Sequence, residues 1–225
     1  MRKVKLLVTM SMASLLLINT ATAFADTPTS KTSIAEVEVT KPENGSGGAE
    51  PEEPIGEPGK PGIGSGDFTI NGLSDFNFGK IEMGKLGKAI VAKDRKLGLE
   101  VIDERGLGSG WNVQVVMGEF KSTEEGNKNT IAKGWKLVIP AGTVTSKFGD
   151  LANPPKSQEV IIDKMAASVV FSADKDTGLG TYTNVFMDDK TADEEKSVRL
   201  SIPTYAKIGK YKADLIWVLT NAPKN

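Results

Sequence analysis

Residues that commonly carry out chemistry in proteins are partly missing from this 225-residue chain. It has no Cys and no His, and 29 acidic residues against 28 Lys and Arg give a formal net charge of −1. Without Cys there is no disulfide, thiol nucleophile or zinc–thiolate site, and without His the commonest general base is absent. Catalysis would have to rest on carboxylates, Lys, Tyr, Ser or Thr.

Carboxylates are therefore the first candidates for an active site. A glycosidase needs two of them placed across a cleft. No spacing singles out one pair among so many acids, so we predict that the protein is not an enzyme. The carboxylates considered are Asp103, Glu104, Asp163, Asp188 and Asp189.

One short segment, Asp174-Lys175-Asp176-Thr177-Gly178, has the alternating carboxylates of a calcium loop. It lacks the third acid, the Gly at the sixth position and the terminal Glu of that loop. We interpret it as a surface turn, since Asp and Gly favour turns. The sequence thus implies no metal and no cofactor. The near-neutral charge also gives no reason to expect a nucleic-acid partner.

The start of the chain has the pattern of a secretory signal peptide. Arg2, Lys3 and Lys5 precede an apolar run from Leu6 to Ile18, and Ala23-Phe24-Ala25 follows as a cleavage site. The apolar run is shorter than the ~20 residues that a membrane-spanning helix needs. We predict that residues 1–25 are removed on export and that the mature protein does not span the membrane.

The next segment, Asp26 to Gly66, differs in composition from the rest. It holds six of the eleven prolines, and its three lysines face eight acids, a charge of 3 − 8 = −5. With so few large apolar residues it cannot offset its ordering entropy, so residues 26–66 are predicted to be a disordered linker. Only Ile34 to Thr40 alternates enough to suggest a short strand.

The region from Asp67 to Asn225, residues 67–225, shows the period-2 alternation of β-strands. Its last segment, Tyr211 to Thr220, is apolar at every odd position, so one face should lie on a core. We expect an all-β domain built as an antiparallel β-sandwich, with a closed β-barrel as the alternative. The other expected strands are Phe68–Ile70, which leads into an Asn71-Gly72 turn, Phe76–Phe78, Leu97–Ile102, Trp111–Val115, Trp135–Pro140, Glu159–Ile162, Ala167–Phe171, Tyr182–Phe186 and Val198–Pro203.

Each of the three tryptophans has an aliphatic residue two positions later, on the same face of its strand. Such aliphatic partners favour a place in the core, where an indole buries a large area. The other interpretation is an exposed indole that stacks on a sugar ring. The pairs are Trp111 with Val113, Trp135 with Leu137, and Trp217 with Leu219.

Two of these segments carry a resemblance to a known family. The run Val101 to Gly106 followed by Ser109-Gly110-Trp111-Asn112-Val113, with the distal Trp217-Val218-Leu219, resembles the WxL-domain surface proteins of Gram-positive bacteria. The first motif departs from the family in having Val in place of Leu, which keeps a branched aliphatic group on that face. The motif residues, in the core or at the wall, are Trp111, Val113, Tyr211, Trp217, Leu219 and Pro223.

The resemblance implies a secreted protein on the cell surface, attached to the cell wall without a covalent bond. Its partner would be peptidoglycan or a wall-attached polymer, bound by the C-terminal β domain. Such proteins commonly work beside other surface proteins. An alternative therefore stays open, in which the domain is a structural or adaptor subunit that docks to another surface protein rather than to glycan.

Overall fold

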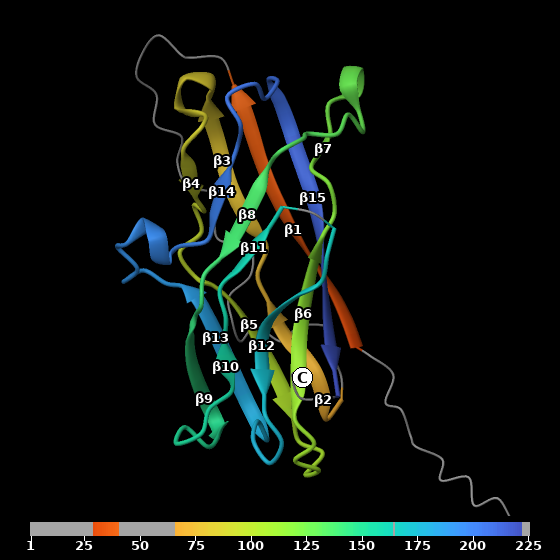
Figure 1. The fold of residues 1–225 in the computed structure, drawn as a ribbon, viewed down its shortest axis with the longest axis vertical. Helices are drawn as coiled ribbons and strands as arrows, with labels where there is room; N and C mark the ends of the chain where they lie inside the picture. Colours follow the sequence, from red (N-terminus) through yellow and green to blue (C-terminus); the bar gives the residue numbers. More distant parts are fainter. Residues whose placement is uncertain (1–28, 41–65, 164, 222–225) are drawn as a thin grey trace, which may run out of the picture.

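The computed structural model describes residues 29–40, 66–163 and 165–221. Within these ranges the chain forms fifteen strands and three 3-10 helices, and no α-helix (Figure 1). The predicted signal peptide, residues 41–65 of the predicted linker, and Pro223 lie outside the described residues. The 3-10 helices are η1 (Met83–Lys85), η2 (Glu125–Asn127) and η3 (Glu194–Lys196).

The strands form one large sheet and two four-stranded sheets. In the large sheet the order is β10 (Lys156–Ser157), β12 (Ser168–Ala173), β6 (Trp111–Met117), β15 (Gly209–Thr220), β1 (Thr29–Thr40) and β3 (Phe76–Glu82), and β7 (Lys121–Ser122) also pairs with β15. One small sheet has the order β2 (Phe68–Leu73), β5 (Leu97–Asp103), β13 (Gly180–Met187) and β9 (Thr143–Gly149). The other has the order β11 (Val160–Ile162), β8 (Lys136–Ile139), β14 (Arg199–Ser201) and β4 (Ala89–Val91).

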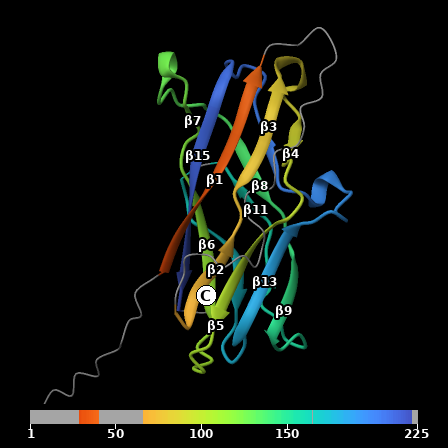
Figure 2. The same ribbon diagram turned by 180° about the vertical axis from the view of Figure 1, so that it is seen from behind.

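The large sheet packs against both small sheets, so the fold is a sandwich. Phe186 of β13 stacks on Trp217 of β15, and Trp135, just before β8, contacts Tyr211 of β15. Figure 2 shows β15, β1 and β3 of the large sheet from behind. The all-β sandwich is confirmed. The pairing is antiparallel except between β1 and β3, which run parallel.

The last strand has the predicted alternation. On β15 the side chains at positions 211, 213, 215, 217 and 219 are buried, while Lys210, Asp214 and Ile216 are exposed. Each large apolar side chain buried in this way stabilises the fold by about 1.5–3 kcal/mol. The strand pairs with β1 on one side and β6 on the other, which places it centrally in the large sheet.

The prediction of a disordered linker is wrong for Thr29–Thr40, which form β1. The suggested short strand at Ile34 to Thr40 is present and begins five residues earlier, at Thr29. Its register with β15 runs from Thr29 opposite Leu219 to Val39 opposite Gly209. Ser33 and Ala35 occupy buried positions on its inner face. Both are small, so they add little hydrophobic signal, and the non-local pairing decides the structure.

Two further local predictions differ from the structure. The expected Asn71-Gly72 turn lies within β2 instead. Asn71 Nδ2 donates to Glu100 Oε1 at 2.7 Å, and the pairing of β2 with β5 shifts its register between Ile70 and Gly72, which keeps both residues in the strand. Ser74 and Asp75 separate β2 from β3, and the Ser74 backbone N–H donates to the Gly98 carbonyl. Strand β9 was not predicted, since it is an edge strand with mostly exposed residues.

Candidate functional site

The two tryptophan motifs lie side by side on neighbouring antiparallel strands. Leu219 of β15 is directly opposite Val113 of β6, and Trp217 is opposite Val115. Residues opposite each other in such a pair project from the same face of the sheet. All four side chains are buried, so both motifs belong to the core face of the large sheet.

Trp217 is enclosed on all sides by core residues. Its side chain is 0% exposed, and Nε1 donates to Ser33 Oγ of β1 at 2.8 Å. Phe186 stacks on the indole at 6.1 Å between centroids, and Phe76 meets it edge-on at 6.4 Å. A buried indole N–H needs such a partner. The hydrogen bond therefore links the distal motif to the N-terminal strand.

Trp111, the first residue of β6, is likewise enclosed by core residues. It is 0% exposed, its Nε1 donates to the Gly178 carbonyl at 3.0 Å, and Phe171 meets it edge-on at 5.0 Å. Gly178 has φ +78°, and a Cβ there would lie 2.7 Å from Nε1. The Asp174–Gly178 turn must therefore end in Gly to let the indole bond to it.

The segment before Trp111 is fixed by an ion pair. Arg105 donates to both carboxylate oxygens of Asp103, through Nε at 2.9 Å and through a terminal nitrogen at 3.0 Å. Its guanidinium also lies 3.5 Å from the ring centroid of Phe68. Further on, Ser109 Oγ donates to Asn221 Oδ1 at 2.6 Å, which ties the chain before the first motif to the chain after the second.

Trp135 and Tyr211 form a third aromatic group with Phe120. The Trp135 ring centroid lies 4.9 Å from that of each partner, and the Tyr211 hydroxyl donates to the Lys207 carbonyl at 3.1 Å. Burial, with a smaller contribution from Glu124, raises the pKa of the Tyr211 hydroxyl. Trp135 is 5% exposed, so it is the one tryptophan that reaches the surface.

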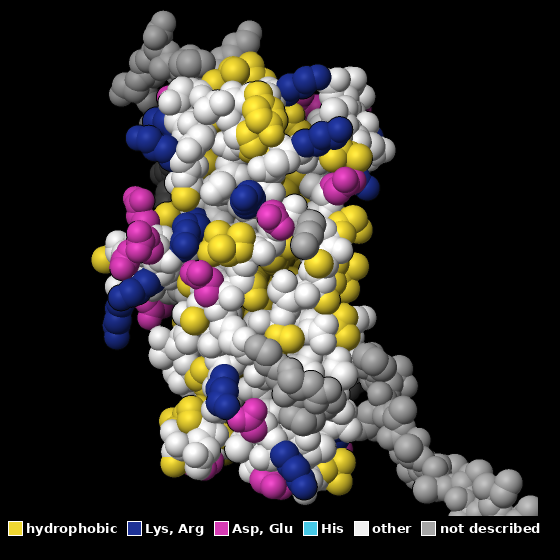
Figure 3. All heavy atoms as spheres, viewed as in Figure 1, with side chains coloured by type: hydrophobic (Ala, Val, Ile, Leu, Met, Phe, Trp, Pro, Cys, Tyr) yellow, Lys and Arg dark blue, Asp and Glu magenta, His cyan; other side chains and the backbone are white. Residues whose placement is uncertain are grey.

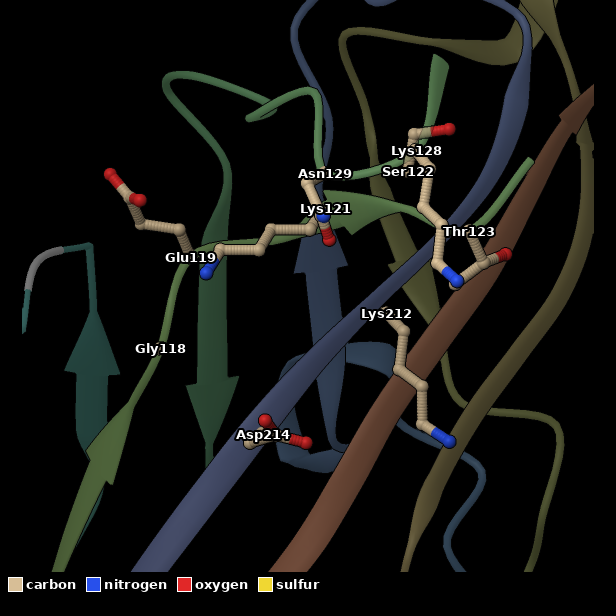
Figure 4. A pocket seen from close by; sticks show the side chains of 9 residues that line it. All are labelled: Gly118, Glu119, Lys121, Ser122, Thr123, Lys128, Asn129, Lys212 and Asp214. Carbon is tan, nitrogen blue, oxygen red and sulfur yellow. The ribbon is translucent and has the colours of Figure 1, made fainter. Parts of the chain in front are cut away.

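Two hollows flank the segment Gly118–Glu119, which follows β6. The first, here called the polar hollow, has a volume of about 210 Å³. Figure 4 shows its charged side chains, which come from the Gly118–Glu119 segment, β7, the loop after η2, and β15. They are joined by hydroxyl and amide groups of Ser122, Thr123 and Asn129, and the charged residues are Glu119, Lys121, Lys128, Lys212 and Asp214.

The second hollow, here called the apolar groove, has a volume of about 370 Å³. It lies on the other side of Gly118–Glu119, where the end of β6 meets the residues before β8 and after β11. Trp135 and Phe120 lie at its base. Aliphatic groups of Met117, Ile131, Ala132 and Met165 line it, and Glu119, Lys133 and Asp163 supply its charges.

The candidate carboxylates of the sequence have mainly structural roles. Asp103 binds Arg105, and Asp188 Oδ1 accepts from Thr191 Oγ1, which lowers the pKa of Asp188. Of the calcium-like segment, Asp174 pairs with Lys156. No group of three or more acidic residues that could hold a metal occurs within residues 29–40, 66–163 and 165–221.

Sequence reasoning found the motif strands but missed both hollows, because each is assembled from segments far apart in the chain. Ile131 and Met165, taken as single hydrophobic residues in the sequence, did not indicate a groove.

No helix within the described part of the chain is long and apolar enough to cross a membrane.

The fold and its paired motifs define an all-β domain with a buried pair of tryptophan triplets. The comparison with protein families matches residues 26–223 to the WxL domain, described as surface cell wall-binding. The chain therefore belongs to the WxL-domain family, which places it at the cell surface in association with the wall. This family is one of wall-binding domains and not of enzymes. Comparisons with curated proteins and with solved structures found no match.

Proposed function

We propose that the mature protein binds peptidoglycan directly and without a covalent bond, after export through a signal peptide at residues 1–25. The family match over residues 26–223 carries this proposal, because it covers nearly the whole chain and is described as wall-binding. The sequence motif for export supports the secretory step.

The burial of Trp111 and Trp217 argues against these two side chains as contacts with the wall. A side chain that is 0% exposed cannot stack on a sugar while the domain stays folded. The motif pair therefore serves to join β6 to β15, and ligand contacts come from surface residues. The polar hollow and the apolar groove are the concave surfaces that offer both hydrogen-bonding and apolar groups.

Co-sedimentation tests this proposal. The protein from Asp26 to Asn225 is mixed with peptidoglycan sacculi that have been stripped of proteins and of attached polymers. Saturable sedimentation supports direct binding. Sedimentation with intact walls but not with bare sacculi means that a polymer or a protein on the wall is the ligand.

A second function is favoured by the outer face of the large sheet. Ile216 is 46% exposed there and lies opposite Val116. Figure 3 shows hydrophobic side chains along the part of the surface over β6 and β15. An exposed apolar strip of this kind suits docking to another surface protein. Pull-down from cells whose wall has been digested separates this adaptor role from peptidoglycan binding.

A further inference from the structure

We propose that the apolar groove is the site that takes the peptide stem of peptidoglycan, and that the sugars are not bound there. This inference rests on the proposed function and assigns one part of the polymer to one surface. The stem is a short, alanine-rich peptide that carries free carboxylates and, before cross-linking, a side-chain amine.

The shape and lining of the groove suit a short peptide. Its volume of about 370 Å³ falls within the range of small-ligand sites. The walls are aliphatic, with Ile131 41% exposed and Met165 70% exposed at the surface. These groups can cover the methyl side chains of alanines, which a polar surface would leave in water.

The aromatic residues of the groove are not placed to stack on a sugar. Trp135 is 5% exposed and Phe120 is 2% exposed, and their rings pack against each other at 4.9 Å. Tyr211 covers the indole from another side, also at 4.9 Å. The aromatic group therefore forms a closed base for the groove and leaves no ring face open to a pyranose.

The charges of the groove match a zwitterionic peptide. Lys133 can bind a stem carboxylate, and Glu119 or Asp163 can bind the amine. No ion pair among the described residues engages these three side chains. Among the described residues that line the groove one cation stands against two acids, and this balance gives no preference for a polyanionic wall polymer.

The neighbouring polar hollow lies where the glycan strand attached to the stem would be bound. It shares Gly118 and Glu119 with the groove and presents hydroxyl, amide and ammonium groups, as Figure 4 shows. Such groups suit the hydroxyls and amides of the glycan strand to which the stem is attached. The two hollows thus divide the polymer between them at the Gly118–Glu119 segment.

The test compares two isoleucines of similar exposure. Ile131→Glu places a charge in the groove, and Ile208→Glu places the same charge at a residue that lines neither hollow, with both isoleucines 41% exposed. Met165→Glu is a second groove variant at a more exposed position. All are checked by circular dichroism and melting, and are then sedimented with bare sacculi, alone and in competition with soluble glycan strands from which an amidase has removed the stems.

We expect Ile131→Glu and Met165→Glu to weaken sedimentation with sacculi by about tenfold or more, and Ile208→Glu to leave it unchanged. The amidase-treated strands should compete poorly with the sacculi, because they lack the stems. A synthetic stem pentapeptide, in its lysine and diaminopimelate forms, should compete and should shift Trp135 fluorescence, with Trp135→Phe as the control that loses the signal.

The outcomes separate the inference from the function on which it rests. If the wild type sediments with sacculi but folded groove variants do so equally well, the groove assignment is wrong and peptidoglycan binding stands. Full competition by the stem-free strands overturns the choice of the peptide. If the wild type does not sediment with bare sacculi, peptidoglycan binding fails and the inference fails with it.

Discussion

Replacing Arg105 by Ala tests whether its ion pair with Asp103 stabilises the chain before the first motif. The side chain of Arg105 is 8% exposed and that of Asp103 only 1%, so the pair is buried. Removing one partner of a buried ion pair leaves the other charge without compensation, at a cost of about 3–5 kcal/mol. Loss of the contact with Phe68 adds roughly 1 kcal/mol.

This loss is a large fraction of the 5–15 kcal/mol by which typical domains are stable. We therefore expect urea unfolding of Arg105→Ala to show a midpoint far below that of the wild type, with a similar slope. Arg105→Lys should recover only part of the difference, since an ammonium cannot form the two-bond fork. The double variant Asp103→Leu, Arg105→Met should be more stable than Arg105→Ala alone.

A loss below about 1 kcal/mol for Arg105→Ala would refute this reasoning, because that is the range of an exposed ion pair. So would a double variant less stable than the single one. That result would mean that packing of the Arg side chain, and not charge compensation, determines the stability.

Three other predictions concern single buried groups. Ser33→Ala removes the partner of the Trp217 indole N–H and should cost about 1–3 kcal/mol in the free energy of unfolding, measured by denaturant titration; no loss would show that the bond is unimportant. Asn184 has both side-chain polar atoms buried without a hydrogen-bond partner among the described residues, so Asn184→Leu should stabilise the fold by about 1 kcal/mol in thermal unfolding, and a lower melting temperature would contradict this. Burial raises the pKa of Asp94 above 3.8, only partly opposed by the hydrogen bond from the Asn77 backbone. The folded state thus holds this proton more tightly than the unfolded state, so stability falls as pH rises from 3.8 through the folded pKa and stays reduced above it. Asp94→Asn should be more stable than wild type at pH 7 and lose that advantage as pH falls below the folded pKa, and a pH-independent difference would count against it.

The sequence allowed the all-β class and the last strand to be predicted, because alternation on Tyr211 to Thr220 is a local property. The resemblance to the WxL-domain family could likewise be found from the short motifs at Trp111 and Trp217. The aliphatic partners of the tryptophans favoured the core, and the burial of both indoles agrees with that interpretation.

Other features depend on contacts between distant segments and could not be predicted. Alternation suggested only the second part of β1, from Ile34 to Thr40; the first part, residues 29–33, is polar throughout and is a strand because it pairs with β15. The register that sets Leu219 opposite Val113 is equally non-local. The apolar groove joins residues near positions 118, 131 and 165, and no periodicity connects them.

The most direct test of the account is the sedimentation of the mature wild type and Ile131→Glu with bare peptidoglycan sacculi, in parallel. We predict saturable sedimentation of the wild type and a loss of about tenfold or more for the folded variant. If the wild type stays in the supernatant at every sacculus concentration, while it still sediments with intact walls, the protein does not bind peptidoglycan directly and the account is wrong.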